Sequence, residues 1–460
     1  MKLRIVDDLN PEDTAMLQAL YSRSAESVDV HLEKVRQSGS GKFMSNFYVG
    51  YGHKSIADCG STTMFIEGVS LLAAKAVQDW PLYSGQETST RYIDMSQQPI
   101  RDPFGTPQSK EILDGWMAFY VSKQDAIGEI IRQRYPKRPD EKQDTYDRAV
   151  KARTFDIMRG FLPAGITTQL SWHTNLRQAG DHLSCMIHHP APEVVQLALG
   201  LKNQLRDRYP SSGFELSLAS VSGVDNKNQA LRDVRQDWEN RVAKAFTYSA
   251  TLDAQHDQIF VASVHGRPIE LFAGARNMGL RRYAEILATR PKGCVLPHFL
   301  TDLGQYTFEF LLDFGSFRDL QRHRNGVIRM PLLDVSWGFE RWYVTELGDL
   351  WQEADKLIEE QTARIRRLPD DPVARQYYTA LGFRVPCQVM MGLPSLLYFL
   401  ELRSGKTVHP TLRKQVHSMI RIFQKNHPHD QIALHVDLDP DDWDVRRGDQ
   451  TITAKDDGRN

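Results

Sequence analysis

The triplet Arg322-His323-Arg324 constrains this chain more than any other stretch, because it places three cationic or ionisable groups where an apolar helix ends. A strand rich in aromatic residues is predicted at 306–311, a helix begins near Phe317, and Gly326 follows the triplet. Guanidinium groups bind phosphate and carboxylate in a bidentate manner, so this helix end is a candidate anion site. Arginines at a helix end can also simply complement the helix dipole. The rest of the sequence has to decide between the two readings.

Bulk composition describes an ordinary globular protein. The chain has 460 residues, of which 41% are hydrophobic and 25% charged, with a net charge of -1. This length suggests two to three domains. We find no long basic tract, no apolar run of roughly 18 residues and no signal peptide, so we expect no nucleic-acid partner, no membrane and a cytoplasmic location. The scattered cysteines form no C-x-x-C pair, which argues against a disulfide framework and a Cys-rich zinc site: Cys59, Cys185, Cys294 and Cys387.

Helical and strand periodicity divides the chain into two similar halves. A strand at 3–6 and a helix capped by Asn10 are followed by a strand at 62–66, a helix that Pro81 ends, and two polar helices between 96 and 150. In the second half, a long charged helix is predicted at 340–367 and an apolar helix at 394–405. The stretch after Tyr209 is rich in Ser, Gly, Asn and Asp. We therefore expect a first unit at 1–215, a connection at 216–242, a second unit at 243–435 and a polar tail at 436–460.

Several short motifs carry a family resemblance. The first half contains G-H-K-S at 52–55, M-F-I-E-G-V-S at 64–70 and E-T-S-T-R-Y at 87–92, and the second contains R-H-R at 322–324 and Y-F-L-E-L-R at 398–403. These motifs resemble the flavin-dependent thymidylate synthases, whose signatures are R-H-R followed after seven residues by S-x-R, and N-x-R followed after eight residues by Arg. The resemblance implies an α+β fold made of two tandem copies, each a mixed sheet with long helices.

The two halves have lost complementary parts of these signatures. The first half keeps Ser89 and Arg91, but Asp79-Trp80-Pro81 stands at its R-H-R position. The second half keeps R-H-R, but Leu332 and Asp334 stand at its S-x-R position. The later signature splits likewise, because the first half has Asn175, Arg177 and Met186 where the second has Gly392, Pro394 and Arg403. Between the two signatures the first half is 26 residues longer.

Reciprocal loss predicts one composite site per chain. Members of the resembled family build each site from neighbouring subunits of a tetramer, so a fusion can keep one site and lose its symmetry mate. A homodimer of fused pairs would then mimic that tetramer. We expect these residues to meet: Ser89, Arg91, Asn175 and Arg177 from the first half, and Arg322, His323, Arg324 and Arg403 from the second.

Residue roles follow from the resemblance. Arg91 and Arg322 would hold a nucleotide phosphate with help from Arg159, Arg403 would hold the pyrimidine, and Ser89 would lie beside the uracil. Backbone groups around Glu87 would supply further donors. The residues expected to act directly in the reaction are Ser89, Arg322 and Arg403. The positions that match FAD-binding residues are His53, Ser55, Asn175, Arg177, Arg322, His323 and Arg324.

The resemblance implies methylation of a uracil nucleotide at C5, from dUMP to dTMP, with methylenetetrahydrofolate and NADPH as co-substrates. Asp319 stands where the family usually has a glutamine near the pyrimidine. A related enzyme acting on another pyrimidine nucleotide is therefore an alternative, and so is a catalytically silent nucleotide-binding or scaffolding homologue.

Two other constellations suggest different chemistry. Pro386-Cys387 resembles the nucleophile of the cysteine-dependent thymidylate synthases, but its apolar neighbours Val385 and Val389 favour an inert core thiol. Residues His182, Cys185 and His189 share one helical face, which suggests either a metal site or an ordinary polar face.

Overall fold

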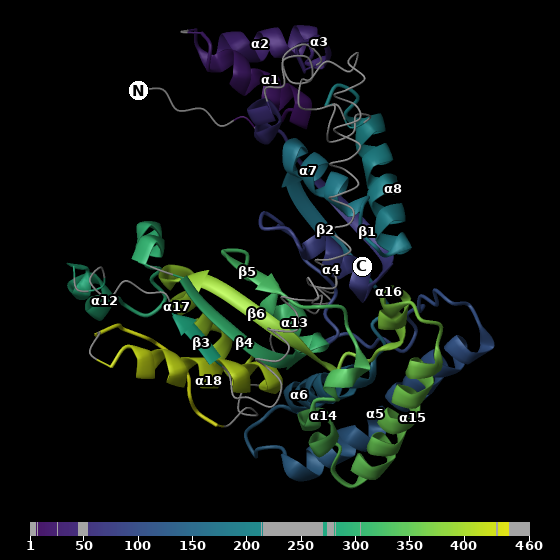
Figure 1. Ribbon diagram of the computed structural model, residues 1–460. Helices are drawn as coiled ribbons and strands as arrows, with labels where there is room; N and C mark the ends of the chain where they lie inside the picture. Colours follow the sequence, from purple (N-terminus) through teal and green to yellow (C-terminus); the bar gives the residue numbers. More distant parts are fainter. Residues whose placement is uncertain are drawn as a thin grey trace. The chain divides into compact units, whose positions relative to one another are not determined.

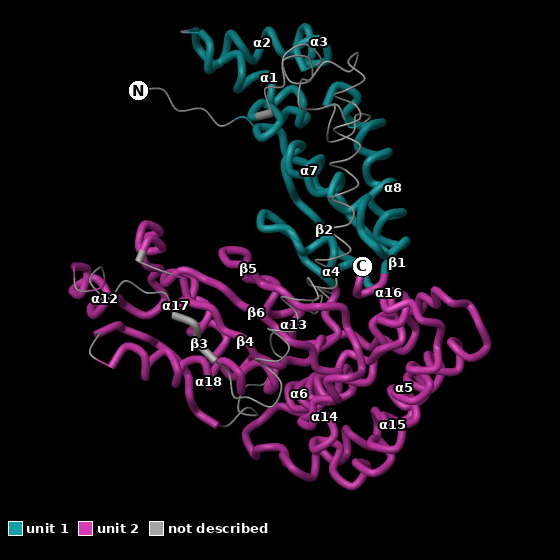
Figure 2. The backbone as a smooth tube through the Cα atoms, viewed as in Figure 1, with its two compact units in different colours: residues 1–69, 73–87, 168–250 teal, residues 70–72, 88–167, 251–460 magenta. Residues whose placement is uncertain are grey.

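The structure is a computed structural model, which describes residues 6, 8–24, 26–44, 54–212, 214, 270–273, 280, 282–303, 305–428 and 431–440. The predicted connection at 216–242, His53 and most of the strand predicted at 3–6 lie outside these residues. The chain forms two compact units (Figure 2). Unit 1 comprises 1–69, 73–87 and 168–250, and unit 2 comprises 70–72, 88–167 and 251–460. Unit 2 therefore combines two segments of the first half with most of the second half.

Unit 1 is built around a two-stranded sheet of β1 and β2 (Figure 1). Asn10 caps the first helix through a hydrogen bond from the backbone N–H of Asp13 to its side chain, at 3.0 Å, as predicted. Gly68, inside β1, has φ +69, a conformation that favours glycine. The elements are α1 Pro11–Tyr21, α2 Val28–Ser38, α3 Gly41–Phe43, η2 Lys54–Cys59, β1 Ser61–Ser70, α4 Leu71–Gln78, β2 Thr167–Asn175, α7 Leu176–Met186 and α8 Pro192–Arg208.

Unit 2 is built around a four-stranded antiparallel sheet in the order β3-β4-β6-β5. Its strands are β3 Glu270–Ala273, β4 Gln305–Asp313, β5 Gly326–Arg329 and β6 Arg384–Gly392. Helices α13 Phe314–Leu320, α17 Leu393–Ser404 and α18 Pro410–Asn426 pack against β4. The remaining elements are α5 Pro107–Arg134, α6 Gln143–Met158, η3 Arg159–Phe161, α12 Ala284–Thr289, η4 His298–Leu303, η5 Val335–Trp337, α14 Arg341–Glu346, η6 Gly348–Leu350, α15 Trp351–Arg367, α16 Pro372–Arg375 and η7 Gln376–Tyr378.

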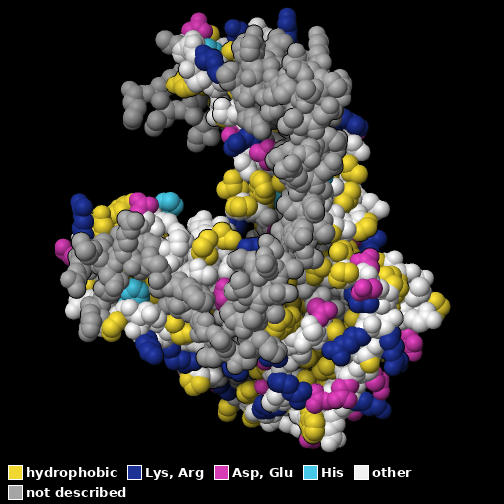
Figure 3. Space-filling view, in the orientation of Figure 1, with side chains coloured by type: hydrophobic (Ala, Val, Ile, Leu, Met, Phe, Trp, Pro, Cys, Tyr) yellow, Lys and Arg dark blue, Asp and Glu magenta, His cyan; other side chains and the backbone are white. Residues whose placement is uncertain are grey.

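The predicted helix at 340–367 is wrong as a single element. It breaks into α14, η6 and α15 at Gly348, whose φ of +56 cannot continue a right-handed helix. The α15 and α5 surfaces carry charges of both signs, as Figure 3 shows, including an ion pair of 2.6 Å between Lys123 and Glu353. The predicted helix at 394–405 is confirmed as α17, with Pro394 in its first turn and Gly405 just past its end.

The order of elements repeats along the chain. The series η2-β1-α4 in the first half recurs as η4-β4-α13 in the second, and η3-β2-α7-α8 recurs as η7-β6-α17-α18. Helix α13 begins 243 positions after α4, whereas β6 begins 217 positions after β2. The difference between these offsets is the 26 residues by which the first half is longer. The chain is therefore two tandem copies of one α+β fold.

Within unit 2 the two copies meet through reciprocal backbone hydrogen bonds. The bonds come in pairs, and in each pair the donor and acceptor of one bond stand 217 positions away from the matching donor and acceptor of the other. This pairing is expected when two copies of a fold are related by a pseudo-twofold axis. The first pair runs from Ala164 N to Thr379 O (2.9 Å) and from Leu381 N to Leu162 O (2.8 Å). The second runs from Gly165 N to Tyr377 O (2.8 Å) and from Gly382 N to Gly160 O (2.8 Å).

Gly382→Ala should destabilise this crossing. A Cβ atom at Gly382 would lie 2.3 Å from Cζ of Phe339, a packed aromatic ring, so the free energy of unfolding should fall by about 1–3 kcal/mol. Denaturant unfolding of the variant measures this loss. Gly128→Ala is the control, since the nearest atom lies 3.9 Å away in a helix interior, and it should stabilise by about 0.5–1 kcal/mol. Equal effects of the two changes would contradict the close packing at this axis.

Candidate active site

The R-H-R triplet lies just past the end of α13, and its side chains alternate in exposure. Asp313 fixes the start of this helix, because its carboxylate accepts a hydrogen bond of 2.8 Å from Ser316 N. After α13 ends at Leu320, Arg322 and Arg324 are exposed while His323 between them is buried. The two guanidinium groups are therefore presented to solvent and the imidazole faces inward.

Both exposed arginines line a cavity of about 590 Å³ in unit 2. The cavity is formed by the residues that follow α13, by the segment that leads into η4, by the end of β6 and by one side of α17 from its first to its last turn. Its lining combines cationic, aromatic and apolar side chains: Val295, Leu296, His298, Arg322, His323, Arg324, Asn325, Met391, Pro394, Ser395, Tyr398, Leu402 and Arg403. Arg324 forms no side-chain hydrogen bond or ion pair with any residue that the structure describes. Such a cavity can accept an anionic ligand.

Arg403 connects α17 to the triplet. Its Nε donates to His323 Nε2 at 2.7 Å, and its Nη2 donates to the carbonyl of Asp319 at 2.7 Å. The His323 ring also packs edge-on against Phe399, with ring centroids 4.9 Å apart. Burial, together with the Arg403 charge, lowers the pKa of His323 to about 3. His323 is therefore a neutral acceptor that fixes Arg403 at the cavity wall.

Stability should fall as the pH drops from about 6.5 towards 3, because the unfolded chain binds a proton that folded His323 does not. His182 and His189, whose pKa burial lowers to about 4, act in the same direction. His323→Gln keeps an acceptor for Arg403 but cannot titrate, so its unfolding free energy should depend less steeply on pH over this window. Denaturant unfolding at several pH values measures the slope. Parallel curves for variant and wild type would contradict a neutral, buried His323.

The S-x-R segment of the first copy belongs to unit 2 and is held by buried contacts there. Ser89 Oγ accepts from the backbone N–H of Arg91 at 3.3 Å. The Arg91 guanidinium contacts both carboxylate oxygens of the fully buried Asp156, at 2.7 and 3.4 Å, and donates to Thr407 O at 3.2 Å. Next to it, Arg318 Nη1 donates to Thr90 Oγ1 at 3.3 Å. Residues of both copies are thus in contact here.

Arg159 is buried, with 2% of its surface exposed, and takes part in a polar network. Its Nη2 donates to Ser316 Oγ at 2.9 Å, its Nε contacts Tyr343 Oη at 3.4 Å, and its Nη1 lies 4.0 Å from Asp319 Oδ2. Neither Arg159 nor Arg91 lines the cavity described above. Both guanidinium groups are instead engaged in contacts within the protein.

The buried carboxylate of Asp319 lies among these arginines. Its Oδ1 is 3.7 Å from Arg322 Nη1, and its Oδ2 is the atom that Arg159 approaches. Burial raises the pKa of Asp319, but Arg322, Arg91, Arg403 and Arg159 lower it more strongly, and the pKa lies well below its usual value. Asp319 is therefore ionised and is the internal counter-charge of the cluster. Sequence reasoning identified Asp319 only as a departure from a family pattern.

The other predicted site residues lie in unit 1. Glu87 accepts from Gln78 Nε2 at 2.8 Å, and Asn175 caps α7 by accepting from Gln178 N at 2.8 Å. Arg177 forms an ion pair of 2.6 Å with Asp58. Ser55 is exposed in η2, and His53 lies outside the described residues. Unit 2 thus brings together seven of the predicted residues: Ser89, Arg91, Arg159, Arg322, His323, Arg324 and Arg403.

The equivalent place in the first copy contains an aromatic pair instead of arginines. By the repeat offsets, Trp80 corresponds to His323 and His182 to Phe399. Their rings stack with centroids 4.7 Å apart, and Trp80 Nε1 donates to Gln178 Oε1 at 2.9 Å. Both copies therefore have a ring–ring contact at this place. The imidazole belongs to α7 in the first copy (His182) but to the R-H-R triplet in the second copy (His323), and the first copy lacks the arginines of the triplet.

The two rival constellations contain no reactive group in the described structure. His182 contacts the carbonyl of Val77 through Nε2 at 3.0 Å, and the described residues hold no group of three or more His, Cys, Asp or Glu that could bind a metal ion. Cys387 lies on β6 with none of its surface exposed, and its Sγ contacts Val385 O at 3.5 Å. A nucleophile for a soluble substrate needs access that Cys387 lacks.

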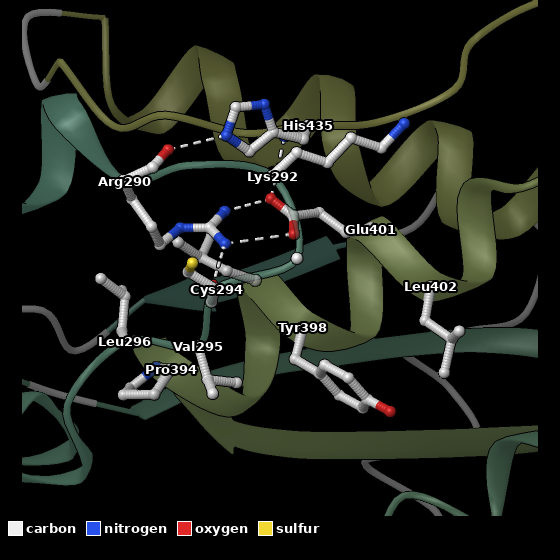
Figure 4. Close-up of a pocket in the computed structure, with 12 residues that line it drawn as sticks. Arg290, Lys292, Cys294, Val295, Leu296, Pro394, Tyr398, Glu401, Leu402 and His435 are labelled. Atoms are coloured by element: carbon white, nitrogen blue, oxygen red, sulfur yellow. Dashed lines mark hydrogen bonds and ion pairs between the residues drawn. The ribbon is translucent and has the colours of Figure 1, made fainter.

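A second cavity of about 310 Å³ adjoins the first and shares Val295, Leu296, Pro394, Tyr398 and Leu402 with it. At its centre Arg290 pairs with Glu401 of α17, which also accepts from the backbone N–H of His435 at 2.9 Å (Figure 4). The contacts of Arg290 with Glu401 were not predicted, because these residues are 111 positions apart in sequence and Arg290 belongs to none of the motifs.

Residues 4–211 match the family described as thymidylate synthase complementing protein. This match covers most of the first half of the chain. The thymidylate synthase complementing fold recurs in the second half through the repeated elements, and this family is the one that the motifs resemble. Similar proteins are a UPF0159 protein of Thermoplasma acidophilum, 24% identical over 90% of this chain and 93% of that protein, and a UPF0159 protein of Chlamydia muridarum, 25% identical over 82% of this chain and 77% of that protein. A UPF0159 protein of Chlamydia pneumoniae is 24% identical over the same shares.

The match to the thymidylate synthase complementing family suggests an enzyme resembling a thymidylate synthase, in the broad area of nucleotide biosynthesis. Among the described helices, none combines the length and apolar character that a membrane span requires.

Proposed function

We propose that this protein is a flavin-dependent thymidylate synthase that methylates C5 of dUMP to give dTMP, with methylenetetrahydrofolate as the one-carbon donor and NADPH as the reductant. One observation carries the proposal. In unit 2 the S-x-R segment of the first copy and the R-H-R triplet of the second are built around the same arginine cluster, although each copy lacks what the other keeps. The charges of four arginines act on Asp319, and two of these arginines, Arg322 and Arg403, line the cavity. Gathering so many like charges is unfavourable for stability, so a binding role accounts for the cluster better.

The cavity residues suit an anionic cofactor or substrate. Arg322 has 46% of its side chain exposed, and the guanidinium of Arg324 is free of side-chain partners within the described part of the chain. The phosphates of a nucleotide and of FAD both need such donors. When bound, FAD would supply the reducing equivalents of the reaction. Arg322, His323 and Arg324 are proposed to contact it.

The remaining residues are proposed to bind and orient the nucleotide. Arg322 would contact phosphate, and Arg403 would present its guanidinium edge to the pyrimidine, because His323 and the Asp319 carbonyl fix its other donors. Ser89 would lie beside the uracil. Arg91 and Arg159 are buried in contacts with Asp156 and Ser316, so we assign them to holding the wall in place, and their predicted contact with phosphate would need a rearrangement of these pairs.

Two measurements test the proposal. The purified protein should be yellow and release FAD on denaturation, or take up added FAD with a change in flavin fluorescence. It should also release tritium from dUMP labelled at C5 when FAD, NADPH and methylenetetrahydrofolate are present. Tritium release that does not depend on NADPH or flavin would contradict the flavin mechanism. A colourless protein that binds neither FAD nor dUMP would indicate the silent homologue.

The proposal extends to assembly. Each chain supplies two copies of the fold, so a homodimer would present the four copies of a tetramer. Light scattering on a sizing column should give twice the mass of one chain, and a monomer that is fully active would contradict this arrangement.

A further inference from the structure

Asp319 places a negative charge within the arginine cluster, which the R-H-R motif alone does not predict. The side chain is 11% exposed, and its two carboxylate oxygens lie 3.7 Å from Arg322 Nη1 and 4.0 Å from Arg159 Nη1. Arg403 also donates to the Asp319 backbone carbonyl at 2.7 Å. A buried, ionised carboxylate is therefore held directly behind guanidinium groups that line the cavity.

Asp319 is the negative charge that acts on the arginines of the cavity, because a second buried carboxylate nearby, Asp156, is paired with an arginine outside it. Asp156 is paired with Arg91 in a bidentate contact and so offsets that arginine. The groups that face the cavity are Arg322, Arg324 and Arg403, and Asp319 does not line it. The negative charge of Asp319 lowers the positive potential at the cavity, and screening by solvent is reduced on the Asp319 side because that side chain is only 11% exposed.

This charge affects possible ligands unequally. A phosphate group carries up to two negative charges, so it is repelled by Asp319 and competes with it for Arg322. The charge of Asp319 changes the binding free energy of an uncharged ribose or base far less. The effect of Asp319 should therefore appear in the comparison of a nucleotide with its own nucleoside, which share every other group.

We propose that Asp319 is a specificity-determining residue, which weakens the hold of the cavity on the phosphate of a pyrimidine nucleoside 5′-phosphate and so limits its preference for the nucleotide over the nucleoside. The inference rests on the proposed function, because it takes a pyrimidine nucleotide as the ligand. It differs from that proposal in assigning a role to a residue that opposes binding.

The test is calorimetric binding of dUMP and of deoxyuridine to the full chain loaded with FAD, at low ionic strength. Asp319→Asn should tighten dUMP binding about tenfold and change deoxyuridine binding by less than about twofold. The gain should shrink in high salt, as expected of a charge effect. Glu285→Gln removes the same charge from the exposed surface of α12 and should leave both affinities unchanged.

Two further variants keep the test decisive if Asp319→Asn is unstable, since it removes a buried charge. Asp319→Gln should show the same increase in the ratio of the two affinities, whereas Asp319→Glu keeps the charge and should preserve the wild-type ratio. Weaker dUMP binding by the neutral variants, or an unchanged ratio, would overturn the inference in favour of a role in orienting Arg322. The wild type would still bind dUMP in that case. If wild type and variants alike bind no dUMP, the proposed function itself fails.

Discussion

Arg322→Ala is expected to lower the rate of dTMP formation by about a hundredfold or more. Arg322 lines the cavity, is nearly half exposed, and is the member of the cluster best placed to meet a phosphate. Loss of a charge-assisted, bidentate contact costs about 2–5 kcal/mol, which corresponds to a factor between about thirty and several thousand. Tritium release from C5-labelled dUMP measures the rate, and dUMP binding should weaken in parallel.

Arg366→Ala is the matched control for this prediction. Arg366 is an exposed arginine of α15 in the same unit, so its removal changes the net charge equally but should leave the rate within about twofold. Arg322→Lys should keep part of the activity, because an ammonium group retains the charge without the fork of donors. If Arg322→Ala retains more than about a tenth of wild-type activity, the placement of the phosphate at this arginine is incorrect.

Arg91→Ala is expected to destabilise unit 2 by about 3–5 kcal/mol. The change removes the bidentate partner of the fully buried Asp156 carboxylate, and a buried charge that loses such a partner is strongly destabilising. Native-state hydrogen exchange of α6, which carries Asp156, should report the loss as faster exchange of its amides.

The double variant Arg91→Ala with Asp156→Ala distinguishes this cause from a simple loss of packing. If the unpaired charge is responsible, the double variant should be more stable than Arg91→Ala alone. Exchange of α6 that is unaffected by Arg91→Ala would show that the ion pair does not hold the S-x-R segment in place.

Local sequence signals predicted the elements around the site because their causes are local. Proline in the first turn and glycine past the end delimit α17, and the position of R-H-R after an apolar helix is correct. Counting residues between motifs also anticipated the 26-residue difference, which the offsets of the repeated elements reproduce. Gly348 was a signal within the predicted long helix, but glycine is tolerated in many helices, and only its positive φ reveals the break.

The partners of the site residues could not be predicted because they depend on long-range contacts. Arg91 pairs with Asp156, 65 positions away, and Arg403 with His323, 80 positions away. No periodicity connects such positions, and a surface arginine looks the same in sequence as a buried one. Arg91 and Arg159 were therefore assigned to phosphate, whereas in the structure their guanidinium groups are engaged within the protein.

The central claim is that each chain has one nucleotide site, completed by residues of both copies. Trp80 and His182 occupy the equivalent place in the first copy, where the arginines are absent. Equilibrium dialysis of radiolabelled dUMP against the FAD-loaded protein counts the sites directly. We predict one dUMP per chain in the wild type and none in Arg322→Ala. Two molecules per chain, or one molecule still bound in the variant, would contradict a single composite site.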